Sequence, residues 1–279
     1  MQMRRLGDLE VGAIGMGAMP LSHAPRPDEE RALATVHAAL DAGVTLFDTA
    51  DAYAIHASEM GHGEELLTRA LAAYRGDADV SQVVIATKGG HTRTPDDGWG
   101  LNGTRPYLRE AAEASARRLG VDAIALYQFH RPDPETPWAE SIGALKELCD
   151  DGLIVRAGIS NANPAQIREA HAILGDALVS VQNELSPAFR TSLPEVDVCD
   201  ELGLAFLPWS PFGGLGDAPE FGAIATERGV SPQQVCLAWL LARSDRMIPI
   251  PGSSRPETIR DSAAATHLEL TSDELARLR

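Results

Sequence analysis

The sequence predicts an α/β protein, a (β/α)8 TIM barrel preceded by an N-terminal β-hairpin. Short apolar runs alternate with amphipathic helical patterns along the chain. Eight such pairs in 279 residues suit a closed barrel. No repeat, low-complexity tract or linker divides the sequence, so we expect one domain over residues 1–279. A doubly wound sheet is the alternative.

The predicted elements start with a hairpin over Arg4–Val11, whose turn is Gly7-Asp8. We expect this hairpin to cover the N-terminal face of the barrel. The predicted strands are Ala13–Gly15, Thr45–Phe47, Val83–Thr87, Ile124–Phe129, Ile154–Ile159, Leu178–Val181, Ala205–Pro208 and Met247–Ile250.

Start and stop signals mark the predicted helices between these strands. A helix over Arg31–Ala42 follows Pro27-Asp28-Glu29-Glu30 and ends at Gly43. Thr104 is the expected N-cap of a helix that ends at Gly120. The pairs Asn163-Pro164 and Ser231-Pro232 each start a further helix, with proline at the first helical position.

Net charge, hydrophobic segments and cysteine content limit the binding partners and the cellular compartment that we expect for this protein. A net charge of −16 argues against nucleic acid or an anionic membrane as the partner. The sequence shows no signal peptide and no apolar run long enough to span a bilayer, so we expect a cytoplasmic protein. The cysteines Cys149, Cys199 and Cys236 fall within helical patterns without metal or disulfide spacing, and we expect buried free thiols.

Three polar side chains directly follow predicted strands. Asp48, Lys88 and His130 come after the second, third and fourth strands, and Tyr53 lies five residues past Asp48. Because barrel strands deliver their next residues to one rim, these side chains should meet there. A lysine beside a phenol lowers the phenol's pKa, and such an acid can protonate a carbonyl oxygen. We expect Tyr53 to donate that proton, with Asp48 holding Lys88 and His130 orienting the carbonyl.

Later strand ends carry side chains that suit a nicotinamide, the group that would supply hydride. Ser160 and Asn161 end the fifth strand and Gln182 the sixth, and they offer partners for a carboxamide. Trp209 ends the seventh strand, where its ring could stack on the nicotinamide. The glycine-rich stretch from Pro211 to Gly216 suits a pyrophosphate. Ser253 and Arg255 precede a helix, which suits a phosphate.

These residues together resemble the aldo-keto reductase superfamily over essentially the whole chain. The matching segments are the hairpin, Ile14-Gly15-Met16-Gly17, Asp48-Thr49-Ala50 with Tyr53, Thr87-Lys88, His130-Arg131-Pro132-Asp133, Gly158 with Ser160-Asn161, Gln182-Asn183-Glu184, Trp209-Ser210-Pro211 and Ile250-Pro251-Gly252. The resemblance implies a barrel that binds NADPH across its rim and reduces a small carbonyl substrate, as a monomer or weak homo-oligomer. NADPH is favoured over NADH through Arg255.

The resemblance also implies which residues form the site. The catalytic set falls on Asp48, Tyr53, Lys88 and His130. The implied cofactor contacts are Gly17, Met19, Ser160, Asn161, Gln182, Trp209, Ser210, Pro211, Phe212, Gly213, Gly214, Leu215, Gly252, Ser253, Arg255 and Asp261. The implied substrate pocket is Met19, Tyr53, Trp99, His130 and Phe212. No metal is implied.

Two other functions remain as alternatives. Channel β-subunits share the family's fold, so the chain could be a nucleotide-binding regulatory module with little turnover. A hydrolase could use Asp48 and Asp51, or a metal held by His56 and His62, although that spacing matches no common ligand pattern.

Overall fold

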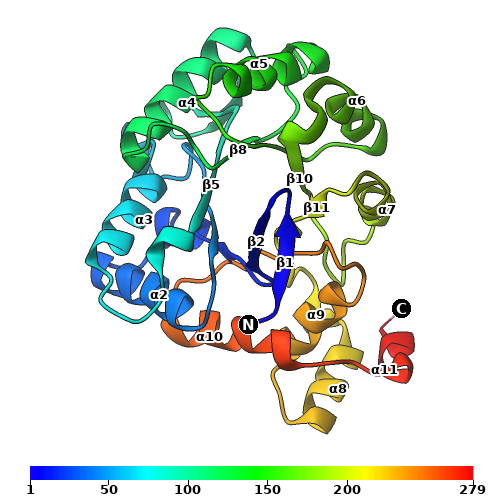
Figure 1. Cartoon of the computed structure of the whole chain (residues 1–279). Helices are drawn as coiled ribbons and strands as arrows, with labels where there is room; N and C mark the ends of the chain where they lie inside the picture. The colour runs from blue at the N-terminus through cyan, green and yellow to red at the C-terminus, as the bar shows by residue number, and fades with distance from the viewer. Residues whose placement is uncertain (279) are drawn as a thin grey trace.

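The computed structural model describes residues 1–278, which form a barrel of parallel strands inside a ring of helices (Figure 1). Seven strands pair in the order β11-β10-β9-β8-β5-β4-β3. Their bounds are β3 Met16–Gly17, β4 Leu46–Asp48, β5 Val84–Gly89, β8 Leu126–Phe129, β9 Ala157–Ser160, β10 Leu178–Gln182 and β11 Ala205–Phe206. The first predicted strand, Ala13–Gly15, was therefore placed too early.

An extended segment, residues 247–252, closes the barrel at the position of the predicted eighth strand. Single parallel bridges join Phe206 to Met247 and Gly17 to Gly252. The amides of Ile248 and Ile250 donate to the β11 side, and the carbonyls of Pro249 and Pro251 accept from the β3 side. Proline has no N–H to donate, so the segment does not become a regular strand, and the prediction of one was wrong.

The hairpin covers one end of the barrel as predicted. It consists of β1 (Met3–Leu6) and β2 (Leu9–Gly12), joined at Gly7, which has a φ of +63°. Leu6 and Val11 are fully buried in one apolar cluster with interior side chains from the starts of the strands. The hairpin therefore closes the N-terminal face and leaves the opposite face for the site.

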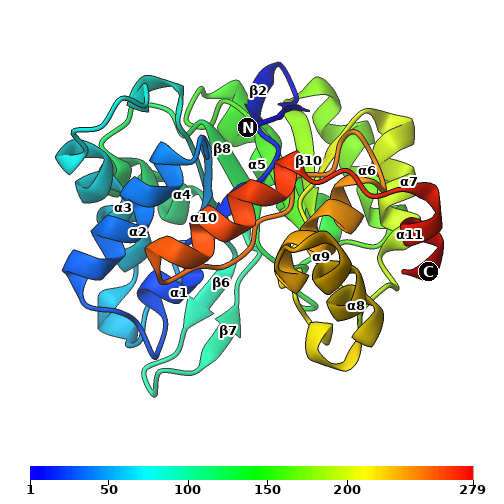
Figure 2. The same ribbon diagram turned by 90° about the horizontal axis from the view of Figure 1, so that it is seen from below.

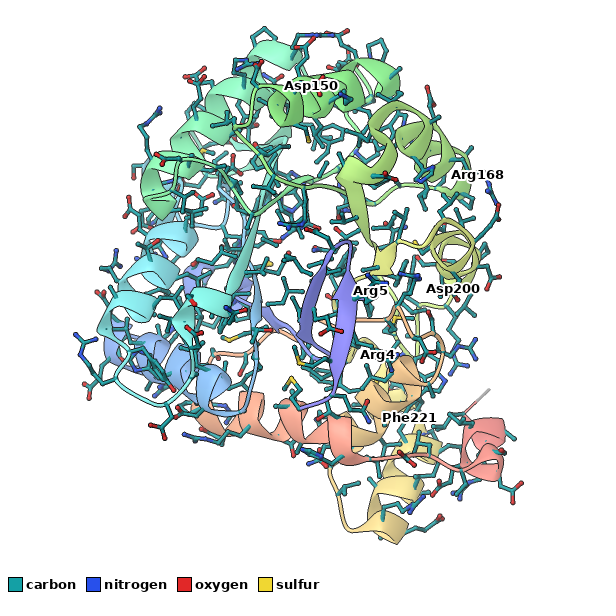
Figure 3. The ribbon with its side chains drawn as sticks, in the orientation of Figure 1. Arg4, Arg5, Asp150, Arg168, Asp200 and Phe221 are labelled. Atoms are coloured by element: carbon teal, nitrogen blue, oxygen red, sulfur yellow. The ribbon has the colours of Figure 1, made fainter. Side chains whose placement is uncertain are left out.

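Helices form the outer layer, and the charged side chains of Asp150, Arg168 and Asp200 on them point to solvent (Figure 3). The longer helices are α2 Glu29–Asp41, α3 His62–Ala73, α4 Arg105–Leu119, α5 Trp138–Asp150, α6 Pro164–Leu174, α7 Leu193–Leu202, α8 Pro219–Arg228, α9 Pro232–Leu241 and α10 Pro256–Ala264. Short helices span Met19–Ser22 (α1) and Ser272–Arg277 (α11). Within residues 1–278 no helix is both long and apolar enough to cross a bilayer.

The capping predictions can be checked bond by bond. Asp28 caps α2 through the Arg31 amide at 2.8 Å, and Asn163 forms a capping box with Gln166 on α6. Ser231 caps α9. Thr104 occupies the N-cap position of α4, but its hydroxyl donates to Asn102 and makes no capping bond.

The three cysteines lie on helices as free thiols. Cys199 on α7 and Cys236 on α9 are fully buried, whereas Cys149 on α5 is only partly buried. The expectation of burial was therefore wrong for Cys149.

A second hairpin, β6 (His91–Arg93) paired with β7 (Trp99–Leu101), leaves the barrel at the end opposite the N-terminal hairpin (Figure 2). It follows β5 after Gly90, whose φ is +111°. The β6–β7 hairpin therefore stands beside the carboxyl ends of the strands.

We expect Gly17→Ala to destabilise the protein, because a Cβ there would lie 2.9 Å from the Ile250 carbonyl oxygen, across the junction between β3 and residues 247–252. Backbone atoms cannot move aside cheaply, so the free energy of unfolding should fall by about 1–3 kcal/mol in urea unfolding. The matched control is Gly216→Ala, where no atom lies within 4 Å of the added Cβ. Equal unfolding midpoints for the two variants would contradict a tight backbone contact between Gly17 and Ile250.

Candidate active site

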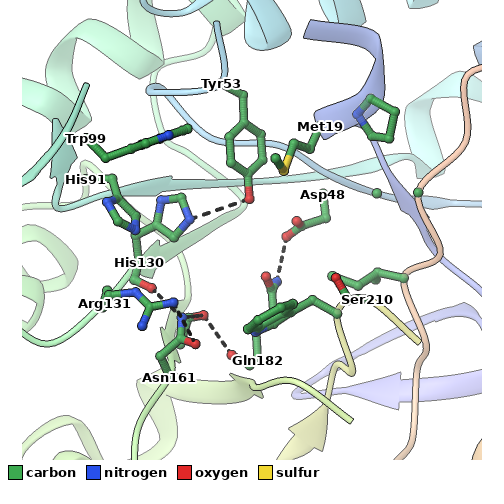
Figure 4. Close-up of a pocket in the computed structure, with 16 residues that line it drawn as sticks. Met19, Asp48, Tyr53, His91, Trp99, His130, Arg131, Asn161, Gln182 and Ser210 are labelled. Carbon is green, nitrogen blue, oxygen red and sulfur yellow. Dashed lines mark hydrogen bonds between the residues drawn. The ribbon is translucent and has the colours of Figure 1, made fainter. Parts of the chain in front are cut away.

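Four side chains predicted from the sequence meet at the open end of the barrel through hydrogen bonds, and Figure 4 shows three of them, Asp48, Tyr53 and His130. The Lys88 ammonium donates to Asp48 Oδ1 at 2.5 Å, to the Thr49 carbonyl at 2.8 Å and to the Tyr53 oxygen at 3.3 Å. The Tyr53 hydroxyl lies 3.5 Å from His130 Nε2. The geometry therefore forms a chain of contacts from Asp48 through Lys88 and Tyr53 to His130.

Lysine carries only donors, so its contact fixes how the phenol is used. The Tyr53 oxygen must accept from Lys88, which leaves the phenolic proton directed away from the ammonium. All three ammonium hydrogens of Lys88 then have partners. The proton of Tyr53 is free to point toward His130 or toward a group in the cavity.

Two glutamines complete the surroundings of Asp48. Gln182 Nε2 and Gln128 Nε2 donate to Asp48 Oδ2 at 2.7 and 2.9 Å. Asp48 is 3% exposed and Lys88 fully buried, so their charges meet away from water. A buried ion pair holds its geometry when further hydrogen bonds satisfy its remaining atoms, as they do here.

Burial is the largest single influence on the pKa of Lys88, Tyr53 and His130, but it does not always set the direction of the shift. It opposes the charge on Lys88, but Asp48 and Tyr53 outweigh it and raise the pKa of Lys88. Burial raises the pKa of Tyr53, and Lys88 only partly offsets this effect. The expectation that Lys88 would give Tyr53 a lowered pKa was therefore wrong for the structure as it stands. Burial, Lys88, His91 and Arg131 hold the pKa of His130 well below its usual value.

A cavity of about 470 Å³ opens over these groups. Its lining is Gly17, Met19, Pro20, Asp48, Tyr53, His91, Trp99, His130, Arg131, Ser160, Asn161, Gln182, Trp209, Ser210, Ile250 and Gly252. Met19 and Trp99 stand at its rim and keep 40% and 43% of their surface exposed.

Half of the implied cofactor residues lie outside this cavity. The residues placed elsewhere are Pro211, Phe212, Gly213, Gly214, Leu215, Ser253, Arg255 and Asp261. Phe212, also implied for the substrate pocket, lines a separate surface pocket with Leu215 and Pro219. Asp261 uses both carboxylate oxygens inside the fold, because Ser231 and Gln234 donate to them at 2.6 Å. Asp261 therefore ties α10 to the start of α9.

Four lining residues received no role from the sequence: Pro20, His91, Arg131 and Ile250. Position could have indicated two of them. Arg131 directly follows His130, and His91 lies three residues past Lys88 at the same strand end. Arg131 donates to Asn161 Oδ1 at 3.2 Å.

The wall opposite Tyr53 contains two residues with unusual backbone. Asn161 and Ser210 have φ values of +59° and +48°. Asn161 is held there by bonds from its side-chain amide to the His130 carbonyl and to Ser160 Oγ. Left-handed backbone at a non-glycine residue costs free energy and tends to mark functional sites.

The acids of the hydrolase alternative do not share the cavity. Asp51 is 1% exposed and lies outside the cavity, and burial together with Glu64 raises its pKa well above the usual value. His56 pairs with Asp97, whereas His62 pairs with Ser22. Within residues 1–278 no group of three or more histidine, cysteine or acidic side chains is placed to hold a metal.

Known proteins match this chain over nearly its full length. A profile of the Aldo/keto reductase family matches residues 13–279. An uncharacterized oxidoreductase of Schizosaccharomyces pombe is 33% identical over 282 residues, which cover 98% of this chain and 88% of that protein. Both the family profile and this relative describe an oxidoreductase.

Solved structures agree with this relationship. A glycerol dehydrogenase from Gluconobacter oxydans superposes with a TM-score of 0.85 at 25% identity, over 99% of this chain and 93% of that one. A thermostable aldo-keto reductase in complex with the inhibitor epalrestat gives 0.81 at 26% identity, over 100% and 98%. Similarity in sequence and in fold together leads to one conclusion: this chain belongs to the aldo/keto reductase family and is an oxidoreductase.

Proposed function

We propose that this oxidoreductase uses NADPH to reduce an aldehyde or ketone to an alcohol, reversibly, with Tyr53 as the general acid. The observation that carries the proposal is the position of the Tyr53 hydroxyl. It lies within hydrogen-bonding distance of both Lys88 and His130 and lines the cavity. A carbonyl oxygen bound between Tyr53 and His130 would receive the phenolic proton.

Each neighbour of Tyr53 has a distinct part in this proton transfer. Lys88 donates to the phenol oxygen, which stabilises the phenolate left behind. Asp48 fixes the ammonium at 2.5 Å and keeps it charged. His130 stays neutral near pH 7 because its pKa is well lowered, so it offers a hydrogen bond without adding a charge.

Side chains on the opposite wall fit a nicotinamide cofactor, which would supply the hydride. The Nε2 of Gln182 is held by Asp48 and Gln128, and within residues 1–278 its Oε1 has no hydrogen-bond partner. That oxygen is an acceptor for the amide group of a nicotinamide. Trp209 lines the same wall and presents a ring on which a flat group could stack.

The preference for NADPH rests on the start of α10. Arg255 occupies its N-cap position, and its side chain is largely exposed with one long contact to Glu257. Ser253 lies just before it, with its hydroxyl bonded to Thr258. A helix N-terminus with an arginine suits a phosphate monoester.

We expect Tyr53→Phe to lower kcat for carbonyl reduction by about 10²- to 10⁴-fold, because it removes the proton donor and little else. The rate is followed as loss of NADPH absorbance with a panel of aldehydes and ketones. NADPH binding, measured by protein fluorescence, should change little. The control is Tyr74→Phe, whose hydroxyl bonds Asp41 away from the cavity. Full activity in Tyr53→Phe would refute the assigned role, and tight NADPH binding without turnover in the wild type would favour the regulatory module.

The two reaction directions should respond differently to pH. Reduction uses the protonated phenol, and the raised pKa of Tyr53 keeps it protonated beyond its usual value of 10.0. The pKa of His130 lies well below its usual value of 6.5, so His130 stays neutral at pH 6.5 and above. Reduction should therefore stay level between pH 6.5 and pH 10.0, whereas alcohol oxidation, which needs the phenolate, should rise with pH. Initial rates at saturating cofactor test this, and a loss of reduction centred near pH 7 would contradict it.

A further inference from the structure

His91 is the lining residue whose chemistry the proposed reaction leaves unused. It begins β6 beside the end of β5, and its ring packs edge-on against His130 with centroids 4.3 Å apart (Figure 4). The ring also meets Trp99 at 5.3 Å, again nearly edge-on. The Tyr107 hydroxyl donates to the His91 carbonyl at 3.2 Å and helps to hold its backbone. The imidazole is therefore fixed beside the proposed carbonyl site.

One hydrogen bond settles where the proton of His91 lies. Its Nδ1 is 3.2 Å from the Gly100 carbonyl oxygen, across the β6–β7 hairpin. A carbonyl oxygen only accepts, so Nδ1 carries the hydrogen. Burial lowers the pKa of His91, helped by Arg131 and Lys88 and opposed by the bond to Gly100, and this keeps the ring neutral at pH 7. In the neutral ring Nε2 then has a lone pair and no hydrogen.

This Nε2 is available to a ligand. Within residues 1–278 no group hydrogen-bonds it, and it is not among the fully buried polar atoms that lack a partner. His130 Nδ1, in contrast, is buried and unpartnered. His91 lines the cavity, and Nε2 is its ring nitrogen that no described protein group occupies.

Aromatic rings form the immediate surroundings of the His91 ring. His130 and Trp99 pack edge-on against it, with centroids 4.3 Å and 5.3 Å away, and Arg131 lines the same cavity. An acceptor at this position favours a substrate that carries a hydroxyl, because the hydroxyl gains a hydrogen bond there and a methylene does not.

We propose that His91 determines specificity by accepting a hydrogen bond from a substrate hydroxyl, so that hydroxy-aldehydes and hydroxy-ketones are the preferred substrate class. His130 lies between Tyr53 and His91, with ring centroids 5.5 Å and 4.3 Å away. All three side chains line one cavity, so a carbonyl held by Tyr53 and His130 leaves the rest of the substrate in a space that His91 also borders. This inference rests on the proposed carbonyl reduction and names its substrate class.

The test compares lactaldehyde with propanal, which lacks only the hydroxyl next to the carbonyl. Wild-type kcat/KM should favour lactaldehyde by roughly five- to tenfold, the effect of one hydrogen bond. In His91→Leu the ratio of the two kcat/KM values should fall by about the same five- to tenfold factor. His91→Gln, which keeps an acceptor, should restore part of the ratio. The matched control is His23→Leu, because His23 also packs against Trp99, with ring centroids 5.8 Å apart, but does not line the cavity.

The outcomes separate this inference from the function beneath it. Turnover of both aldehydes with a wild-type ratio near one, or an unchanged ratio in His91→Leu, would overturn the role of His91 and leave carbonyl reduction intact. Failure of the wild type to reduce any carbonyl with NADPH would overturn the proposed function, and the substrate class with it. A collapsed ratio in His91→Leu, together with an unchanged ratio in His23→Leu, is the expected result.

Discussion

The buried charge of Lys88 is the constraint on which the site depends. An ammonium removed from water costs several kcal/mol unless it is paired and hydrogen-bonded. Asp48, the Thr49 carbonyl and Tyr53 together meet that requirement, and all three come from the end of β4 and the segment that follows it. The parallel register of β4 and β5 sets the first of these contacts, because it fixes how far Asp48 and Lys88 are offset at the strand ends. Barrel geometry and proton chemistry are thus specified by the same strand pairing.

The sequence was sufficient for the architecture and the four central residues. Hydrophobic periodicity, together with capping residues, glycines and prolines, was enough to place most strands and helices. Buried parallel strands appear in the sequence as short apolar runs, and helix ends carry recognisable capping residues. Asp48, Lys88 and His130 could be brought together because each follows a strand of one barrel. Ser160, Asn161, Gln182 and Trp209 followed by the same reasoning and share the cavity.

What the sequence could not supply depends on three-dimensional packing. Burial raises the pKa of Tyr53 and Lys88 lowers it, and the extent of burial cannot be read from a sequence motif. His91 reaches the cavity because the chain turns at Gly90 into the β6–β7 hairpin, whereas Phe212 lines a separate pocket. The last barrel segment reads as a strand in hydrophobicity, but Pro249 and Pro251 remove the amides that would pair it with β3.

Those two prolines also affect how the barrel holds together. β3 and residues 247–252 meet at Gly17 and Gly252. Here the carbonyls of Pro249 and Pro251 accept hydrogen bonds from β3 and its preceding residue, but these prolines have no amide hydrogen to donate in return. Fixed φ angles pre-shape the closing segment and reduce the entropy it loses on folding. Gly17 and Gly252 also line the cavity, one from each side of the junction. A ligand that contacts both glycines would bridge this junction, and its binding free energy would add to the stability of the closed barrel.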